Sequence, residues 1–319
     1  MPSAPEPRGV TLAVPCRTDE PALGRTLAAA LASFRRWAGA PAAPLEVLVC
    51  LNGPDAGPTL AALCAFAADA GAPLADVDLD AGAPLPPPAP ALGVVALRTR
   101  RTGKAIAWNL LRARLRTTTA LFLDADVSFV PDALGLLLDA LAAHPGAVLA
   151  SGKTTCAPRP GAFEAVMAAP YGVDFPNLSP QLYAARVAGL PAAMPEDLIE
   201  PERWLELTVA VAPGRVVRVP AARVAVRLPG TLADFFRQRI RIEMGKVQIA
   251  RAYPGLEARS TPQPRGRAAL ALGPAGTLRL GAYLALRTVA HVIAWWRYRR
   301  GATDGIWRQA ATTKRWDAA

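Results

Sequence analysis

Four short apolar runs in the first 125 residues constrain the fold more than any other feature of this sequence. They are residues 10–16 (VTLAVPC), 45–51 (LEVLVCL), 93–98 (GVVALR) and 119–123 (TALFL). Continuous apolar runs of this length are typical of strands buried on both faces of a parallel sheet. Segments 21–38, 58–71 and 103–116 lie between them and are predicted to be helical. The alternation predicts an α/β fold in which a mostly parallel sheet is flanked by helices.

The charge of the chain changes near residue 230. Residues 1–230 contain 20 basic and 20 acidic side chains, whereas residues 231–319 contain 16 basic and 5 acidic ones. The whole formal charge of +11 therefore lies after residue 230. We predict one domain over 1–230 and a basic helical region over 231–319. Charge confined to the tail, without a recognised module, argues against a nucleic-acid partner.

Three smaller features complete the organisation. Residues 72–92 are rich in proline and alanine and are predicted to form an extended surface loop. The cysteines form no CxxC pair and lie in or beside apolar stretches, so we expect buried free thiols: Cys16, Cys50, Cys64 and Cys156. The N-terminal MPSAPEPRGV lacks the basic and apolar regions of a secretory signal, and we expect a cytoplasmic location.

Two carboxylates follow the fourth apolar run. Asp124 and Asp126 stand directly after TALFL in the sequence LFLDADVSF. Ligands of open parallel sheets collect at the carboxyl ends of the strands. Two carboxylates at i and i+2 can converge there on Mg²⁺ or Mn²⁺, which prefer oxygen ligands and leave positions open for phosphate oxygens. The pattern favours a metal-assisted nucleotide-diphosphate site over a solvated loop whose aspartates only cap the next segment.

The neighbouring residues resemble glycosyltransferase family 2. TGKAIAWNLLRARLRTTTALFLDADVSF is similar to the family pattern G-K-x-x-A-L-N, helix, apolar strand and D-x-D, with Trp108 in the usual Leu position. The matching residues are Gly103, Lys104, Ala107 and Asn109. LAVPCRTDEPAL resembles the opening strand and P-x-x-N-E loop, with Thr18 for Asn and Asp19 for Glu. EVLVCLNGPDAGPT resembles the second strand, with Asn52 where many members carry Asp.

The resemblance covers residues 9 to about 250 and implies both a fold and an activity. The fold is GT-A, a Rossmann-like α/β architecture. The activity is metal-dependent, inverting transfer of a sugar from a nucleotide-diphospho-sugar donor to a hydroxyl acceptor. The implied donor-binding residues are Pro15, Arg17, Asp19, Asn52, Lys104 and Asp124. Asp124 and Asp126 would bind Mg²⁺ or Mn²⁺.

The general base has two candidate positions. An inverting transferase needs a carboxylate that takes the proton of the acceptor hydroxyl. The family supplies it from an E-D pair before a helix, and MPEDLIEPERWLEL contains two alignments. In one, Glu196-Asp197 is the pair and Asp197 is the base. In the other, Pro201-Glu202 occupies the pair and Glu202 is the base, which fits the family spacing E-D-x-x-L to Leu205.

A basic amphipathic helix is predicted over residues 231–250. Its apolar stripe consists of Leu232, Phe236, Ile240, Met244 and Val247. QRIRI resembles the Q-x-x-R-W element of processive and lipid-acceptor family members, with Ile242 in place of Trp. The resemblance implies that the polar residues of this element contact the donor diphosphate or the acceptor. These residues are Gln238, Arg239 and Arg241. The alternative is an ordinary surface helix with arginines on its solvated face.

Residues 276–300 are the most apolar stretch late in the chain. Arg287 and His291 interrupt the segment, which disfavours a membrane-spanning helix. Trp295, Trp296 and Tyr298 alternate with arginines, a pattern that favours an amphipathic helix at a membrane interface. A helix packed on the protein is the third alternative. We expect a peripheral protein on the cytoplasmic membrane face, and the tail favours a lipid-linked or envelope-glycan acceptor.

Two other functions compete with glycosyl transfer. A sugar-phosphate nucleotidylyltransferase shares a similar sheet but opens with a G-x-G-T-R loop, whereas this chain reads PCRTDE at that place. A catalytically inactive relative that acts as a binding or scaffold protein is the stronger alternative. It is suggested by the departures from the family pattern at Asn52, Pro201 and Ile242.

Overall fold

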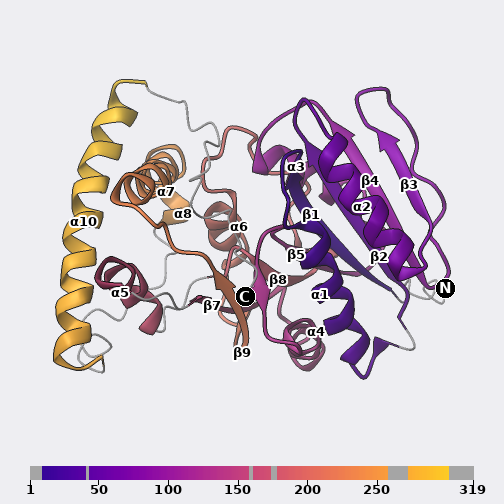
Figure 1. The fold of residues 1–319 in the computed structure, drawn as a ribbon, viewed down its shortest axis with the longest axis horizontal. Coiled ribbons are helices and arrows are strands. Elements are labelled where there is room, and N and C mark those ends of the chain that lie inside the picture. The colour runs from indigo at the N-terminus through magenta and orange to yellow at the C-terminus, as the bar shows by residue number, and fades with distance from the viewer. Residues whose placement is uncertain (1–8, 41–42, 158–160, 174–177, 258–271, 302–319) are drawn as a thin grey trace.

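The strands of the chain pair into one mixed sheet (Figure 1). The computed structural model describes residues 9–40, 43–157, 161–173, 178–257 and 272–301. Within these residues the sheet has nine strands in the order β3-β4-β2-β1-β5-β8-β7-β9-β6. The α/β class and the flanking helices predicted from the sequence are confirmed.

The first half of the sheet is parallel. It contains β1 (Val10–Arg17), β2 (Leu45–Asn52), β3 (Leu74–Asp78), β4 (Leu92–Thr99) and β5 (Thr119–Leu123). Neighbours β3 and β4, β4 and β2, β2 and β1, and β1 and β5 all run in the same direction. The carboxyl ends of these strands therefore meet at one edge of the sheet.

The second half is mixed. It contains β6 (Ser128–Phe129), β7 (Leu149–Cys156), β8 (Leu182–Arg186) and β9 (Val216–Val226). β8 joins the parallel half by pairing antiparallel with β5, and β7 pairs antiparallel with β8. β9 runs parallel to β7 and carries the two-residue β6 at the far edge.

Helices cover both faces of the sheet. One face packs on α1 (Leu23–Arg36), α2 (Gly57–Ala70) and α4 (Ala133–Ala143), and the other packs on α3 (Lys104–Arg112) and α6 (Pro201–Val209). Successive strand residues enter opposite faces. Leu12 and Val14 join the first core, and Ala13 joins the second. Because both faces are buried, β1 and β2 are apolar along nearly their whole length.

Two expectations from the sequence need correction. The proline-rich segment 72–92 is not loop throughout, because β3 pairs with β4 inside it. This edge strand has only Val77 fully buried, so it has no apolar run to reveal it. Cys16 and Cys50 are buried as expected, but Cys156 is only half-buried and Cys64 is exposed on α2.

The described part of the C-terminal region contains three helices: α7 (Leu232–Ala252), α8 (Pro254–Glu257) and α10 (Gly273–Arg299). The Thr231 side chain accepts a hydrogen bond from the Asp234 amide (3.1 Å) and so caps α7. α10 lies at one end of the molecule and packs along α7 (Figure 1). Of the predicted α7 stripe, Ile240, Met244 and Val247 are buried, whereas Leu232 at the first turn is 47% exposed.

Three shorter helices lie between the strands, and the first two of them contact α10. They are α5 (Ala162–Ala168), η2 (Ala169–Gly172) and η3 (Val187–Gly189). Met167 of α5 packs with Phe235 of α7 and Tyr283 of α10. Among the described residues, no helix is both long enough and apolar enough to cross a membrane.

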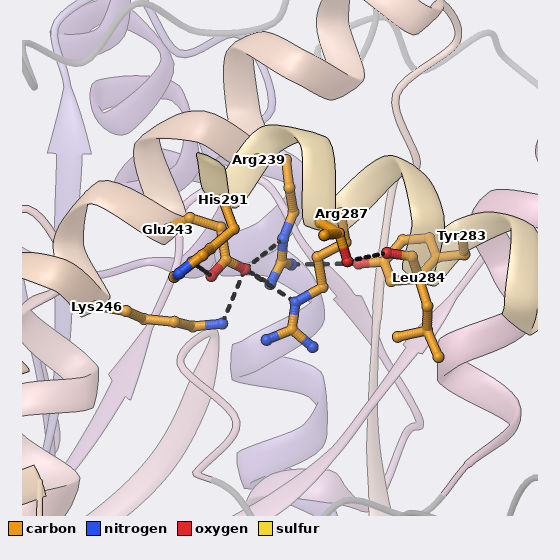
Figure 2. A network of polar contacts seen from close by, with 8 residues as sticks. Arg239, Glu243, Lys246, Tyr283, Leu284, Arg287 and His291 are labelled. Atoms are coloured by element: carbon orange, nitrogen blue, oxygen red, sulfur yellow. Dashed lines mark hydrogen bonds and ion pairs between the residues drawn. The ribbon is translucent and has the colours of Figure 1, made fainter. Parts of the chain in front are cut away.

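A buried carboxylate joins α7 to α10 (Figure 2). Glu243 of α7 is 2% exposed, and its Oε1 atom accepts from Arg239 Nε (3.0 Å) and Lys246 Nζ (3.1 Å). The same atom accepts from Arg287 Nε of α10 (3.0 Å), and Oε2 lies 3.2 Å from His291 Nδ1. Burial raises the pKa of Glu243, but the surrounding cations outweigh burial and hold the pKa well below its ordinary value.

We expect Glu243→Gln to destabilise the protein by about 3 kcal/mol, because the change leaves several cations around a neutral side chain. A depressed carboxyl pKa stabilises the folded state above the ordinary pKa of about 4.3, and that stabilisation is lost as the pH falls below it. The difference in unfolding free energy between wild type and variant should therefore be full at pH 7 and smaller near pH 3.5, as measured by chemical denaturation.

Glu257→Gln is the matched control. Glu257 is 42% exposed and lies 3.5 Å from Arg203, so its removal should cost less than about 1 kcal/mol. Equal losses for the two variants would contradict the stabilising role of Glu243.

Candidate functional site

A cavity of about 280 Å³ opens beside the carboxyl ends of the parallel strands. The strand register brings these ends together, since Arg17 pairs with Asn52, and Asn52 pairs with Thr99. Asp124 follows β5 directly, and its amide donates to the Gln181 carbonyl at 2.9 Å. The predicted residues that line the cavity are Pro15, Arg17, Lys104, Asp124, Asp126, Glu202, Gln238 and Arg241.

Lys104 joins two carboxylates at the centre of this cavity. Its Nζ atom lies 2.7 Å from Asp124 Oδ1 and 2.6 Å from Glu202 Oε1. Lys104 begins α3 after Gly103, whose φ of 140° lies in a region that favours glycine. Glu202 stands in the first turn of α6, after Pro201. The sheet edge and two helix starts thus bring together groups that are far apart in the sequence.

Burial and neighbouring charges together set the ionisation of the central groups. Burial raises the pKa of Asp124, Lys104 opposes this rise, and the charges of Glu202 and Asp126 add to it, so that the pKa is about 6. Burial alone would lower the pKa of Lys104, but Asp124 and Glu202 raise it above its ordinary value. Lys104 therefore stays protonated. Its single positive charge does not balance the negative charges of Asp124, Asp126 and Glu202.

This excess of negative charge fits a divalent cation. Asp124 and Asp126 could supply carboxylate oxygens, the donors that Mg²⁺ and Mn²⁺ prefer. In the part of the chain that the structure describes, no cluster of three or more His, Cys, Asp or Glu side chains could hold a metal ion. A cation here would need oxygen atoms from a ligand to complete its coordination, as Mg²⁺ commonly takes from substrate phosphates.

Basic and amide side chains line another wall of the cavity. Gln238 and Arg241 come from α7, Arg17 ends β1, and Arg227 follows β9. Among the described residues, Gln238 and Arg241 have no hydrogen-bond partner, so their donors are available to a ligand. A wall that supplies cations next to a carboxylate centre suits a diphosphate bound through a metal.

Four predicted residues do not line the cavity. Asp19 is exposed and pairs with Arg17, with Oδ1 2.9 Å from Arg17 Nε. Asn52 is 2% exposed and donates from Nδ2 to the Gly103 carbonyl (3.1 Å), so it supports the start of α3. Asp197 is exposed and accepts from Gln248. Arg239 instead belongs to the Glu243 contact between α7 and α10.

Asn109 fixes the segment that precedes α6. Its Nδ2 atom donates to the Met194 carbonyl, and its Oδ1 atom accepts from the Met194 amide, both at 2.8 Å. This segment contains Asp197 and leads to Glu202. The two hydrogen bonds from α3 therefore help to determine which carboxylate reaches the cavity.

The cavity also contains residues that the sequence did not indicate as site residues: Glu20, Tyr171, Gln181, Glu200 and Arg227. Glu20 Oε1 accepts from the Ala22 amide at the start of α1, which a helix-capping pattern could have revealed. Glu200 packs over Gly245 of α7, where a Cβ atom would lie 2.3 Å from Glu200 Cγ. Burial raises the pKa of Glu200, and Arg241 opposes this rise. Tyr171, Gln181 and Arg227 come from separate elements that only the fold brings together.

The sheet, its flanking helices and the cavity at the strand ends define a protein of the GT-A fold type. The structure of the mannosyltransferase PcManGT from Pyrobaculum calidifontis, in complex with GDP-Man and Mn²⁺, shares this fold with a TM-score of 0.54 and 22% identity. The match covers 95% of this chain and 81% of that one.

Weaker matches are S. aureus TarS 1-349 in complex with UDP and glucosyl-3-phosphoglycerate synthase from Mycobacterium tuberculosis in complex with Mg²⁺ and UDP. Their TM-scores are 0.48 and 0.46, with 14% and 15% identity. The first match covers 92% of both chains, and the second covers 76% of this chain and 79% of that one. No protein-family model and no curated protein matches the sequence.

Proposed function

We propose that this protein is an inverting glycosyltransferase of family 2, which moves a sugar from a nucleotide-diphospho-sugar to a hydroxyl acceptor. The observation that carries the proposal is the contact of Lys104 with both Asp124 and Glu202 inside a cavity at the strand ends. The GT-A fold shared with a mannosyltransferase bound to GDP-Man and Mn²⁺ supports it.

In the proposed reaction Asp124 and Asp126 hold Mg²⁺ or Mn²⁺. The ion, when bound, neutralises charge on the diphosphate as it leaves. Gln238 and Arg241 bind diphosphate oxygens from the opposite wall. Lys104 keeps Asp124 and Glu202 oriented, while Pro15 and Arg17 line the cavity and support the nucleotide end of the donor. Asp19 and Asn52 support that end indirectly, through the ion pair with Arg17 and the hydrogen bond to Gly103.

Glu202 is the base that we propose. Its carboxylate takes the proton of the acceptor hydroxyl while the acceptor oxygen bonds to the anomeric carbon. The bond between that carbon and the diphosphate oxygen breaks, and its electron pair leaves with the nucleotide diphosphate. Attack opposite the leaving group inverts the anomeric configuration. Glu202 lies in the cavity and Asp197 outside it, which supports this choice.

A panel of nucleotide sugars, each with and without Mn²⁺, tests donor binding. A ligand that binds only the folded protein at 100 times its Kd stabilises it by about 2.7 kcal/mol. We expect a rise in Tm for one class of donor, dependent on Mn²⁺, together with slow donor hydrolysis. A stabilised but inactive protein would favour a binding or scaffold role, and no stabilisation by any donor would contradict the proposal.

The membrane surface is the second partner that we propose. α10 carries an exposed apolar stripe on the side away from α7, with exposed fractions of 77% for Leu278, 49% for Val289, 59% for Val292 and 49% for Trp296. Arg299 and Arg300 at its end stack on Trp295 and Trp296. An apolar stripe that ends in arginines complements a surface of anionic lipid on the cytoplasmic face. This contact favours a lipid-linked or envelope-glycan acceptor.

We expect Val289→Ser combined with Val292→Ser to reduce co-sedimentation with anionic vesicles at least tenfold. Both side chains are already exposed, so the Tm should change little. The matched control is Ala285→Ser combined with Thr288→Ser, which changes α10 without removing a large apolar side chain. Undiminished co-sedimentation of the valine variant would contradict the membrane contact.

A further inference from the structure

A second cavity, of about 610 Å³, lies between α7 and α10. It shares no lining residue with the cavity that contains Lys104 and Glu202. Glu243, Lys246 and Arg287 form its polar wall. Its other walls include Val247, Leu284 and Trp295. The proposed transfer reaction makes no use of it.

The charges at this cavity are unequal. Arg239, Lys246 and Arg287 all contact one oxygen of Glu243 (Figure 2), so three basic side chains surround one carboxylate oxygen. His291 contacts the other oxygen and adds no negative charge. The remaining acid of the cavity, Glu257, lies 3.5 Å from Arg203. Glu200, outside this cavity, interacts electrostatically with Arg239 and Lys246. Two carboxylates thus act on the three cations, and an excess of positive charge remains.

Donors of this cluster remain accessible. The side chains of Lys246 and Arg287 are 37% and 41% exposed, whereas that of Glu243 is 2% exposed. Among the described residues, the two terminal nitrogens of Arg287 have no hydrogen-bond partner, and Lys246 Nζ has only Glu243. Burial and then Arg239 lower the pKa of Lys246 to about 8. An added anion would offset the repulsion that Lys246 experiences.

The apolar side of the cavity continues onto the surface. Leu284 and Trp295 line it and are 44% and 40% exposed. At 100° per residue, Val292 lies next to Trp295 around α10, so the cavity wall borders the apolar stripe of the helix. A molecule bound here can place an anionic group on Lys246 and Arg287 and an apolar chain against Leu284 and Trp295.

We propose that the cavity between α7 and α10 binds the phosphate group of an anionic phospholipid. Lys246 and Arg287 donate to the phosphate oxygens, with Arg251 at the rim, and Leu284 and Trp295 contact the start of an acyl chain. The inference rests on the proposed membrane contact only for the source of the lipid. The cavity between α7 and α10 is distinct from the acceptor site, because the proposed base, Glu202, lines the other cavity.

Binding of a monomeric short-chain lipid tests the site without a membrane. Dioctanoyl phosphatidylglycerol, below its critical micelle concentration, should raise the Tm and bind measurably by titration calorimetry. Dioctanoyl phosphatidylcholine should bind at least fivefold more weakly, because its head group has no net charge. Inorganic phosphate and glycerol 3-phosphate distinguish a lipid site from a site for a soluble anion. If they bind as tightly as the lipid, the assignment to a phospholipid is wrong.

Charge variants locate the binding. Lys246→Gln and Arg287→Gln should each raise the Kd for the short-chain anionic lipid at least tenfold. In each of these variants Glu243 keeps two of its three ion pairs with Arg239, Lys246 and Arg287, so the protein should still fold. Arg251 also lines the cavity but does not contact Glu243, so Arg251→Gln should raise the Kd about threefold. The matched control is Arg279→Gln, which removes one charge from α10 away from the cavity and should leave the Kd within twofold.

The outcomes separate this site from the other proposals. Absence of lipid binding, or equal weakening by Arg279→Gln, overturns the phosphate site even when donor binding and vesicle binding persist. Conversely, the Val289→Ser, Val292→Ser protein should lose vesicle binding but keep monomeric lipid binding. Stabilisation by a sugar donor tests the transferase proposal independently, because Lys246 and Arg287 do not line the cavity that contains Lys104 and Glu202.

Discussion

Asp124→Asn should lower the rate of sugar transfer by about 10³-fold, the loss typical when one group that stabilises developing charge is removed. Asp124 ends the parallel half of the sheet, lines the cavity and contacts Lys104 at 2.7 Å. The change removes both the proposed metal carboxylate and a partner of Lys104. Transfer rates measured over a Mn²⁺ titration should show a weaker apparent metal affinity together with the lower rate.

Asp126→Asn separates these two effects. Asp126 lines the same cavity, and Lys104 pairs with Asp124 and Glu202, so the loss of Asp126 should weaken the response to Mn²⁺ while Lys104 keeps these two carboxylates. Asp132→Asn is the matched control, because Asp132 is exposed at the start of α4 and lies outside the cavity. Transfer within tenfold of wild type in both site variants would contradict the proposed metal position.

The sequence predicts the parallel half of the sheet well because burial on both faces leaves apolar runs. β1, β2, β4 and β5 all coincide with such runs to within two residues. The mixed half leaves no such pattern. β7 reads LASGKTTC and loses its full burial after Gly152, and β9 contains Pro220 and arginines in a partly exposed strand. Their pairing depends on contacts between distant segments.

The site residues likewise differ in how well the sequence predicts them. Strand ends indicate Asp124 and Asp126, because the position after a parallel strand is fixed by the strand itself. The choice between Asp197 and Glu202 depends on tertiary contacts instead. Gln248 of α7 binds the Asp197 carbonyl (2.9 Å), and Asn109 of α3 holds Met194, so the loop turns Asp197 outward. No local pattern in MPEDLIEPERWLEL contains that information.

Arg239 illustrates a second limit of helical periodicity. The residue lies off the apolar stripe of α7, and periodicity alone predicts a solvated position or contact with the donor. α10 covers that side of α7, and Arg239 is 16% exposed and bound to Glu243. A residue opposite one packing surface can be buried by another element whose docking position the sequence does not specify.

Glu202→Gln should lower kcat by about 10²- to 10⁴-fold, the usual contribution of a general base. The amide keeps the size of the side chain and can still accept a hydrogen bond from Lys104, but it cannot take the proton of the acceptor hydroxyl. The Kd of the donor, measured by calorimetry in the presence of Mn²⁺, should therefore stay within about threefold of the wild-type value. A loss confined to kcat distinguishes a missing base from a disrupted donor site.

Asp197→Asn is the matched control, since it makes the same acid-to-amide change five residues away. Asp197 is exposed and outside the cavity, and its backbone carbonyl still accepts from Gln248 in the variant. Its kcat should stay within about twofold of wild type. The reverse result, with Asp197→Asn inactive and Glu202→Gln active, would assign the base to the first alignment. If both variants retain the wild-type rate, neither carboxylate is the base and the proposed proton transfer is wrong.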